Sequence, residues 1–394
     1  MEIVYSPYDE RVMADPWATY RRMQDDAPAY YIPDLDCWAL SRFEDIWQAS
    51  MDRHSYTAGH GTSPDALFLA SEPPPSVFLF MDPPAHGVHR GMIAKSYQKD
   101  KIATIDAHVR AIVRELLMPA LETGRIEVYH LASRVALFVI ADFIGLTREE
   151  ILHIRGLIDR FYTREPGVRG TTPAGAQAFA EAHDYIHGLI GKYRRQPPAS
   201  HSHINTWLHA IAADTTMTDE EIFFSIFAMV ITGSDTVPLT TASCVYYLDQ
   251  FPDQQALARR DPALLAGAFE ETARYDQPTN LLGRRLVRDV ELHGQTMREG
   301  QSVLFLYAAA GRDGREFEQP DSFNIERKMR RTLAFGTGIH FCLGQHLARL
   351  EGRIILEELM ASIPEFAVER AACRRVYGEF LQSYCSVPIS FKPR

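Results

Sequence analysis

Residues 335–344 of the chain read FGTGIHFCLG, and apolar residues at helical spacing follow over residues 345–359. The three glycines permit unusual backbone angles and leave room for a flat ligand to approach the backbone. Cys342 comes just before the helix, where the positive end of the helix dipole and free N–H groups would stabilise its thiolate. The stretch therefore predicts an anionic sulfur ligand. A glycine-rich turn around one inert cysteine would not explain why all these residues occur together.

A second motif interrupts an apolar helix that the spacing predicts over residues 219–249. Residues 232–236 read TGSDT, and each buried polar group there needs a hydrogen-bond partner. A functional groove explains this stretch better than a core helix does. Pro238 has no N–H to bond the carbonyl of Ser234, and its ring crowds that oxygen. We therefore expect a bulge or kink in the helix beside residues 233–236.

A third motif is the pair Glu271 and Arg274, which stand at i and i+3 in a helix predicted over residues 263–275. Taken alone, such a pair is usually exposed and contributes ~0.2–0.5 kcal/mol. Its place in the chain, between the TGSDT motif and the cysteine stretch, favours a role in the fold over a pair on the surface.

In this order the three motifs resemble those of the cytochrome P-450 superfamily. The haem-binding loop of that family has the pattern F-x-x-G-x-H/R-x-C-x-G, which residues 335–344 match. The resemblance implies that Cys342 is the axial thiolate ligand of the iron in haem b. It also implies that Phe335, Gly336 and Gly344 contact the cofactor.

The resemblance assigns roles to the other two motifs. Residues 232–236 match the family's A/G-G-x-D/E-T segment, in which Thr236 would hydrogen-bond dioxygen or a neighbouring water and Asp235 would relay protons. These two residues are the predicted catalytic pair. Glu271 and Arg274 match the structural E-x-x-R element, which braces the haem side of the fold.

Two positions depart from the family pattern. Thr232 stands where alanine or glycine is usual, so an extra methyl and hydroxyl would narrow the oxygen site. Ser322 stands where an arginine often joins the pair of Glu271 and Arg274. The brace is therefore expected to be incomplete, or to use Arg327 instead.

Haem carries two propionates, which need cations or water when they are enclosed. We expect Asp82 to cap a helix that has Pro83 in its first turn. This places His86 and Arg90 at i and i+4 on one face, where they can hold one anion together. Bacterial members of the family have the same D-P-P and H-x-x-x-R pattern, which implies that both residues bind propionates.

Further propionate donors come from the C-terminal half of the chain. Arg284 fits the family's arginine at the first β element, and His340 fits another donor. Arg285 is the competing choice, because only one of two neighbouring strand residues can face inward. We favour Arg284.

Outside the motifs the pattern predicts a mainly α protein with small β-sheet elements (α+β). Helical spacing occurs over residues 102–121, 127–146, 176–193, 219–249 and 263–275, and short strands are predicted within 37–41, 285–306 and 376–391. No long linker or repeat divides the chain, so we expect one domain over residues 1–394. The resemblance implies a single large triangular fold with a long central helix over the haem.

Composition excludes several classes of protein. The 394 residues are 46% hydrophobic and carry a formal net charge of −10, which argues against a nucleic-acid binder. The apolar windows at 135–146 and 222–231 are shorter than the ~20 residues of a membrane span, and the start shows no secretory signal. We expect a cytoplasmic protein that binds no membrane.

The five cysteines form no C-x-x-C pair, which argues against disulfides and a cysteine zinc site.

The substrate contacts implied by the resemblance lie on apolar segments and indicate a hydrophobic small molecule. They are Ala228, Ile231, Thr232, residues 279–282 including Asn280 and Leu281, Phe380 and Leu381, with the loop 55–80 and the region 161–182. Asn280 and Thr232 could fix one polar group of the guest. His201 and His203, in a proline-rich loop, are expected to be solvated.

The implied activity is that of a monooxygenase that inserts one atom of O2 into an unactivated C–H bond of this guest. Electrons would come from NAD(P)H through a ferredoxin reductase and a ferredoxin, because the chain has no room for fused redox domains. Arg330 and Arg331, just before the cysteine stretch, would form part of the ferredoxin surface. We expect a monomer. The alternatives are a peroxide-using or non-oxygenase haem-thiolate protein, a haem sensor, and a helical binding protein without a cofactor.

Overall fold

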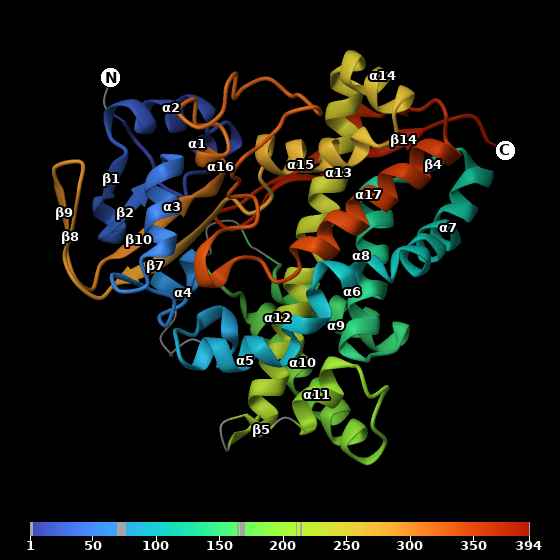
Figure 1. The fold of residues 1–394 in the computed structure, drawn as a ribbon, viewed down its shortest axis with the longest axis horizontal. Helices are drawn as coiled ribbons and strands as arrows, with labels where there is room; N and C mark the ends of the chain where they lie inside the picture. The colour runs from blue at the N-terminus through green and yellow to red at the C-terminus, as the bar shows by residue number, and fades with distance from the viewer. Residues whose placement is uncertain are drawn as a thin grey trace.

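Four buried helices form the centre of the computed structural model, which describes residues 3–68, 76–163, 165, 170–209, 211–212 and 215–393. They are α8 (Val128–Ile144), α12 (Asp219–Ser234), α13 (Thr236–Gln250) and α17 (Gln345–Ser362). Residues 135–141 of α8 are all buried, because the sequence VALFVIA is apolar on every face of the helix. These helices occupy the middle and right of Figure 1, with the N-terminal sheet at the left.

The helix predicted over residues 219–249 is interrupted at Asp235, which confirms the expected break. α12 begins with a capping box between Thr218 and Glu221 and ends at Ser234, and α13 begins at Thr236. Asp235 has φ −105° and ψ −46°, and backbone bonding resumes with Leu239 N–H donating to the Asp235 carbonyl at 3.3 Å.

Helices α12 and α13 together form a longer apolar segment than the window at residues 222–231 indicated. Asp219–Gln250 spans 32 residues and passes, by length and composition, as a segment that could cross a membrane. However, 67% of its most apolar window is buried inside the protein. A buried segment of this kind is typical of a core helix.

A five-stranded sheet lies near the N-terminus, with strand order β1-β2-β10-β7-β3. The strands are β1 (Ala29–Ile32), β2 (Cys37–Leu40), β3 (Tyr56–Thr57), β7 (Leu281–Leu286) and β10 (Ser302–Leu306). β10 runs parallel to β2 and antiparallel to β7, pairing Val303 with Arg284. This sheet therefore joins the start of the chain to the segment that follows α15 (Leu264–Tyr275).

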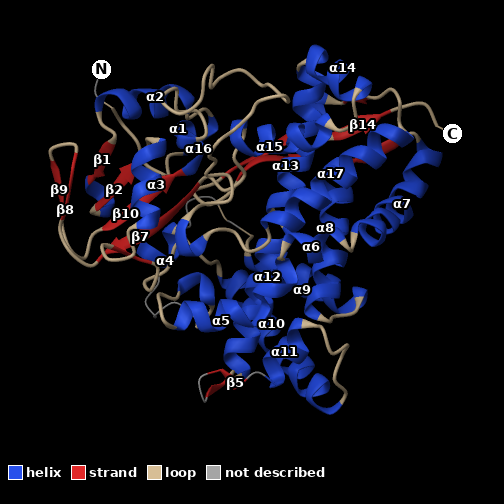
Figure 2. Cartoon of the chain, viewed as in Figure 1, coloured by secondary structure: helices blue, strands red, loops and turns tan. Residues whose placement is uncertain are grey.

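The other strands are short and form small separate sheets, shown in red in Figure 2. They are β4 (Arg125–Glu127), β11 (Ala367–Val368) and β14 (Pro388–Ser390) in one sheet, and the pairs β5 (Ile211–Ala212) with β6 (Thr215–Thr216), β8 (Val290–Leu292) with β9 (Gln295–Met297), and β12 (Arg374–Tyr377) with β13 (Gln382–Ser386).

The remaining helices surround the four central ones and the sheet. They are α1 (Glu10–Ala14), α2 (Trp17–Asp26), α3 (Phe43–Met51), α4 (Pro64–Phe68), α5 (Ala85–Ala94), α6 (Lys99–Ala103), α7 (Asp106–Thr123), α9 (Arg148–Phe161), α10 (Pro173–Arg195), α11 (His203–His209), α14 (Pro252–Arg260) and α16 (Tyr307–Ala310), with short 3₁₀ turns at Pro33–Leu35, Phe78–Phe80, Lys95–Tyr97, Gly338–His340 and Arg370–Ala372. The outline in Figure 1 is roughly triangular, with the sheet, α7 and α11 towards its three corners. The prediction of a mainly α fold with small sheets is confirmed.

Glu271 and Arg274 are buried together in α15 and are not an exposed pair. Two hydrogen bonds of 2.7 and 2.8 Å join them, and Arg274 also donates to the carbonyls of Gly311 and Pro320. Arg327 supplies the second guanidinium, with its Nε 3.0 Å from a Glu271 carboxylate oxygen. Of the two expectations for this brace, replacement by Arg327 is the one that the structure shows.

Candidate active site

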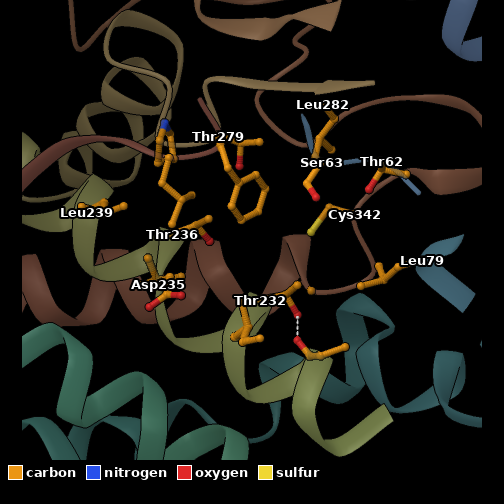
Figure 3. Close-up of a pocket in the computed structure, with 18 of the residues that line it drawn as sticks. Thr62, Ser63, Leu79, Thr232, Asp235, Thr236, Leu239, Thr279, Leu282 and Cys342 are labelled. Atoms are coloured by element: carbon orange, nitrogen blue, oxygen red, sulfur yellow. Dashed lines mark hydrogen bonds between the residues drawn. The ribbon is translucent and has the colours of Figure 1, made fainter. Parts of the chain in front are cut away.

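A cavity of about 1000 Å³ lies between the α12–α13 break and residues 335–344. Cys342 lies on its wall, and Figure 3 shows the sulfur facing the space that Thr232 and Thr236 border. Residues 335–344 thus lie opposite the TGSDT motif, as the sequence predicted.

The backbone of residues 335–344 turns tightly where glycine is required. Gly338 has φ +72°, and a Cβ atom there would lie 2.4 Å from the Ser50 carbonyl oxygen, so no other residue fits. The Cys342 N–H donates to the Phe335 carbonyl at 2.9 Å and closes the loop. Phe335, Gly336, His340 and Gly344 all lie on the cavity wall.

Two effects act in opposite directions on the Cys342 thiol. Burial raises its pKa, whereas the Gly344 N–H and the cations of Arg90 and Arg349 lower it, and burial prevails. The thiol form is therefore favoured until a cation at the sulfur stabilises the thiolate.

Basic side chains that form no ion pair with the described residues gather around the cavity, and the Asp82 carboxylate acts on Arg284 only at longer range. Arg90 and Arg284 line the cavity, and neither forms an ion pair with any described residue. Arg90 donates to the Phe341 carbonyl at 2.5 Å and Arg284 to the Gly283 carbonyl at 2.7 Å. Such uncompensated cations mark a place for anions.

His340 and His86 extend this basic group. Their ring centroids are 4.6 Å apart, and neither Nε2 has a hydrogen-bond partner among the described residues. Burial and the neighbouring Arg284, His86 and Arg90 lower the pKa of His340 to about 3. His86 packs beside His340 and is not itself on the cavity wall.

Of the two neighbouring arginines, Arg284 is the one on the cavity wall. It is buried in β7, whereas Arg285 points the other way and donates to the Leu67 carbonyl at 3.3 Å. The strand pleat separates the two side chains as expected.

Asp82 does not cap the helix that carries His86 and Arg90, and this part of the prediction is wrong. α5 begins at Ala85, later than expected, and Pro84 occupies the cap position. The Asp82 carboxylate instead accepts hydrogen bonds from the Thr57 hydroxyl and the Ala58 N–H. These donors on and beside β3 draw the side chain away from the helix start.

Asp235, in the helix break, is buried and pairs with Arg155 of α9. Burial raises the pKa of the Asp235 carboxyl, and Arg155 only partly offsets this effect. Arg155 also pairs with the exposed Asp159 at 2.7 Å, so charged groups lead from the surface to the cavity wall. Thr232, on the same wall, donates its hydroxyl to the Ala228 carbonyl at 2.8 Å.

Two of the predicted substrate contacts lie elsewhere. Asn280 is fully buried, accepts from the Tyr20 hydroxyl at 3.1 Å and donates to the Gly378 carbonyl at 3.0 Å. Leu281 packs in the core beside the sheet. The other two residues of the predicted segment 279–282, Thr279 and Leu282, line the cavity as expected, and Figure 3 shows both. Ala228, Ile231, Thr232, Phe380 and Leu381 line it as predicted.

Comparison with known proteins identifies the family. The cytochrome P450 family model matches residues 259–369. Cytochrome P450 123 of Mycobacterium tuberculosis is 33% identical over 397 residues, which cover 100% of this chain and 98% of that protein. The chain belongs to the cytochrome P450 superfamily. Membership implies a haem iron cofactor and the monooxygenase class of oxidoreductase.

Other P450 proteins match along most of their length. Vitamin D(3) 25-hydroxylase of Pseudonocardia autotrophica is 28% identical over 382 residues, covering 95% of this chain and 92% of that enzyme. The crystal structure of CalO2 has a TM-score of 0.85 at 28% identity and covers 100% of both chains.

The residues of this P450 fit a haem. The cavity wall offers a sulfur ligand and, for two propionates, the guanidinium groups of Arg90 and Arg284 and the unpartnered Nε2 of His340. The unpartnered Nε2 of His86 lies next to this wall, because the ring packs beside His340. Anions here would also stabilise the buried charges of Arg90 and Arg284, whose pKa values burial lowers.

Sequence reasoning placed Phe161 and Phe179 in a predicted substrate region but missed Phe224 and Phe227 of α12, and all four rings line the cavity. The helical spacing of Phe224 and Phe227 indicated a core, and only the structure shows that this part of the core is hollow. Residues 69–75, 164 and 166–169 of the two predicted substrate loops lie outside the described residues.

His203 is buried, whereas its proline-rich sequence predicted a solvated side chain, so this prediction is wrong. Its ring packs on Tyr97, Phe143 and Trp207, with centroids 5.5, 5.8 and 5.6 Å away. Burial lowers its pKa to about 3.

Proposed function

We propose that this P450 is a haem-thiolate monooxygenase in which Cys342 is the axial ligand of haem b. The observation that carries the proposal is the Cys342 sulfur on the wall of a cavity of about 1000 Å³, which also holds Arg90 and Arg284 without an ion pair among the described residues. Arg90, Arg284, His86 and His340 would hold the propionates. Haem bound here supplies the reductive activation of O2 that inserts one oxygen atom into the guest.

The remaining chemistry at this site is proton delivery. Asp235 and Thr236 form the predicted catalytic pair at the break between α12 and α13. The raised pKa of Asp235 suits a group that takes a proton from the Arg155 side and passes it to the Thr236 hydroxyl. Arg155 holds the carboxyl in place between these two sides.

A hydrophobic small molecule fits the cavity wall, which is mostly apolar and aromatic. Thr232 supports this inference because its hydroxyl proton is already donated to the Ala228 carbonyl of the same helix and is not free for a polar group of the guest. The guest would bind in the part of the cavity that is lined by the phenyl rings of α9, α10 and α12 and by Phe380 and Leu381.

Electrons would come from NAD(P)H through a ferredoxin reductase and a ferredoxin. Of the basic residues predicted to dock the ferredoxin, Arg330 is exposed, whereas Arg331 is bound to Glu316 and Glu44. Charge reversal at Arg330 should therefore slow electron transfer more than reversal at Arg331 and leave guest affinity unchanged. We further expect a cytoplasmic monomer that binds neither nucleic acid nor membranes.

Thiolate ligation is tested by the absorption spectrum of the reduced protein under carbon monoxide. Wild type should show the strongly red-shifted Soret band of a thiolate-bound haem, and Cys342→Ala should abolish it. Cys385→Ala is the matched control, because Cys385 also lines the cavity and should leave the band unchanged. A colourless wild type after haem supplementation, or an unchanged band in Cys342→Ala, would overturn the proposal.

Proton delivery is tested by Asp235→Asn under turnover with reductase, ferredoxin and NADPH. The substitution should slow product formation about a hundredfold while guest affinity stays constant. Asp142→Asn is the control with near-normal turnover, because Asp142 pairs with His108 and does not line the cavity. Equal activity of wild type and Asp235→Asn would favour peroxide-driven chemistry instead.

A further inference from the structure

Two histidines and a glutamate meet on the outer side of the helices that cover the cavity. His183 and His187 stand at i and i+4 on one face of α10, and Glu220 lies in the first turn of α12. The three side chains are at least partly exposed and lie outside the cavity wall. They come from two helices that are adjacent in space but distant in sequence.

The ligand atoms already have the spacing of a metal site. The Nε2 atoms of His183 and His187 lie 3.0 and 3.2 Å from the same Glu220 oxygen. All three ligand atoms lie within 4.8 Å of one another. A tetrahedral zinc ion with bonds of about 2.0–2.2 Å needs its ligand atoms about 3.3–3.5 Å apart. The two distances to Glu220 are within about 0.5 Å of this value, and the two histidine nitrogens need to approach by at most about 1.5 Å.

Glu220 is the acidic residue of this turn that faces the histidines. Of its two acidic neighbours, Asp219 is bound to Arg194 and Glu221 closes the capping box with Thr218. Glu220 takes part in neither interaction, and its carboxylate contacts the two histidines instead.

The histidine rings are held in orientation from behind. Both pack on the buried Phe223, with centroids 4.8 and 5.8 Å away. The Nδ1 of His183 lies 3.7 Å from the Asp184 carboxylate, which leaves Nε2 for a metal.

We propose that His183, His187 and Glu220 form a zinc site with its fourth position open to water. Two imidazoles and one carboxylate are a donor set that zinc accepts in proteins. Binding replaces the Nε2 contacts with Glu220 by metal bonds. Each ring that carried its proton on Nε2 gives it up to water; a neutral ring takes one back on Nδ1, and a protonated ring releases its Nε2 proton. No oxidation or reduction is involved.

Such an ion would fasten α10 to α12 over the cavity. Phe179 lies one turn before His183 on α10 and lines the cavity, and its ring centroid is 5.4 Å from that of Phe227 on α12. Zinc would therefore hold this aromatic wall closed and slow the exchange of a bound guest.

The test is equilibrium dialysis of the haem-loaded protein against ZnCl2, followed by measurement of zinc and iron in the same sample. Wild type should bind one zinc per chain with a Kd at or below about 10 μM. His183→Ala, His187→Ala and Glu220→Ala should each weaken binding at least about tenfold. His108→Ala is the matched control, because it breaks a separate pair, His108 with Asp142, and should leave zinc binding unchanged.

A second measurement separates metal binding from misfolding. Zinc should raise the thermal unfolding midpoint of wild type and of His108→Ala but not of His183→Ala, whose midpoint without zinc should equal that of wild type. Zinc that remains bound in the double variant of His183 and His187, or wild-type binding only at millimolar zinc, would overturn the proposal.

Discussion

Replacing His203 by phenylalanine should remove part of the acid sensitivity of the fold. His203 is 1% exposed, and neither ring nitrogen has a hydrogen-bond partner among the described residues. Burial lowers its pKa from 6.5 to about 3, so it stays neutral in the folded protein at any pH above that value. In the unfolded chain it takes up a proton once the pH falls below 6.5.

The magnitude follows from this difference in pKa. Protonation favours the unfolded state as the pH falls from 6.5 towards 3, so the folded protein loses stability over that window. Between pH 7 and pH 5 the loss is about 2 kcal/mol. This figure hardly changes for any folded pKa below about 4, because the folded form is then neutral at both pH values.

The assay is urea unfolding of wild type and His203→Phe at pH 7 and pH 5. The difference in unfolding free energy between the two proteins should shift by about 2 kcal/mol in favour of the variant on acidification. His201→Phe is the matched control, because His201 is exposed two residues away and should change nothing. A parallel pH dependence of wild type and His203→Phe would refute the burial argument.

Three further predictions concern the brace, the propionate donors and the cavity wall. Arg327→Ala should lower the free energy of unfolding by about 3 kcal/mol, measured by urea unfolding, because it leaves a buried carboxylate short of one partner; a loss below about 1 kcal/mol would contradict a structural role. Arg284→Ala should speed haem transfer to apomyoglobin about tenfold or more, whereas Arg285→Ala should not, and equal rates would contradict the assignment. Leu282→Ala should change guest affinity in spectral titrations, while Leu281→Ala should reduce stability by about 3 kcal/mol without changing affinity.

The parts of the site that could be predicted are those fixed by local chemistry. Pro238 cannot complete the helix bonding, and the break at Asp235 follows from that fact alone. Arg284 and Arg285 are separated by the pleat of one strand. The position of Cys342 follows from glycines without which its loop could not turn.

The parts that could not be predicted depend on contacts between distant segments. Asn280 and Leu281 lie where the chain changes from loop to strand, and no periodicity marks which side chains then face inward. His203 stands in a polar loop, but Tyr97 and Phe143 cover it from elsewhere in the chain. The single-domain organisation and the roles of the site residues stay predictions.

Residues 311–337, which lead to the cysteine loop, contain neither helix nor strand. Arg274 and Arg327 hold much of this segment through its carbonyl oxygens, among them those of Glu318 and Ser322. Every amino acid supplies the same carbonyl acceptor, so the exposed side chains of this segment are open to redesign. Surface tags or altered charges could be engineered there without moving the sulfur, provided that the two guanidinium groups and the proposed docking residue Arg330 are kept.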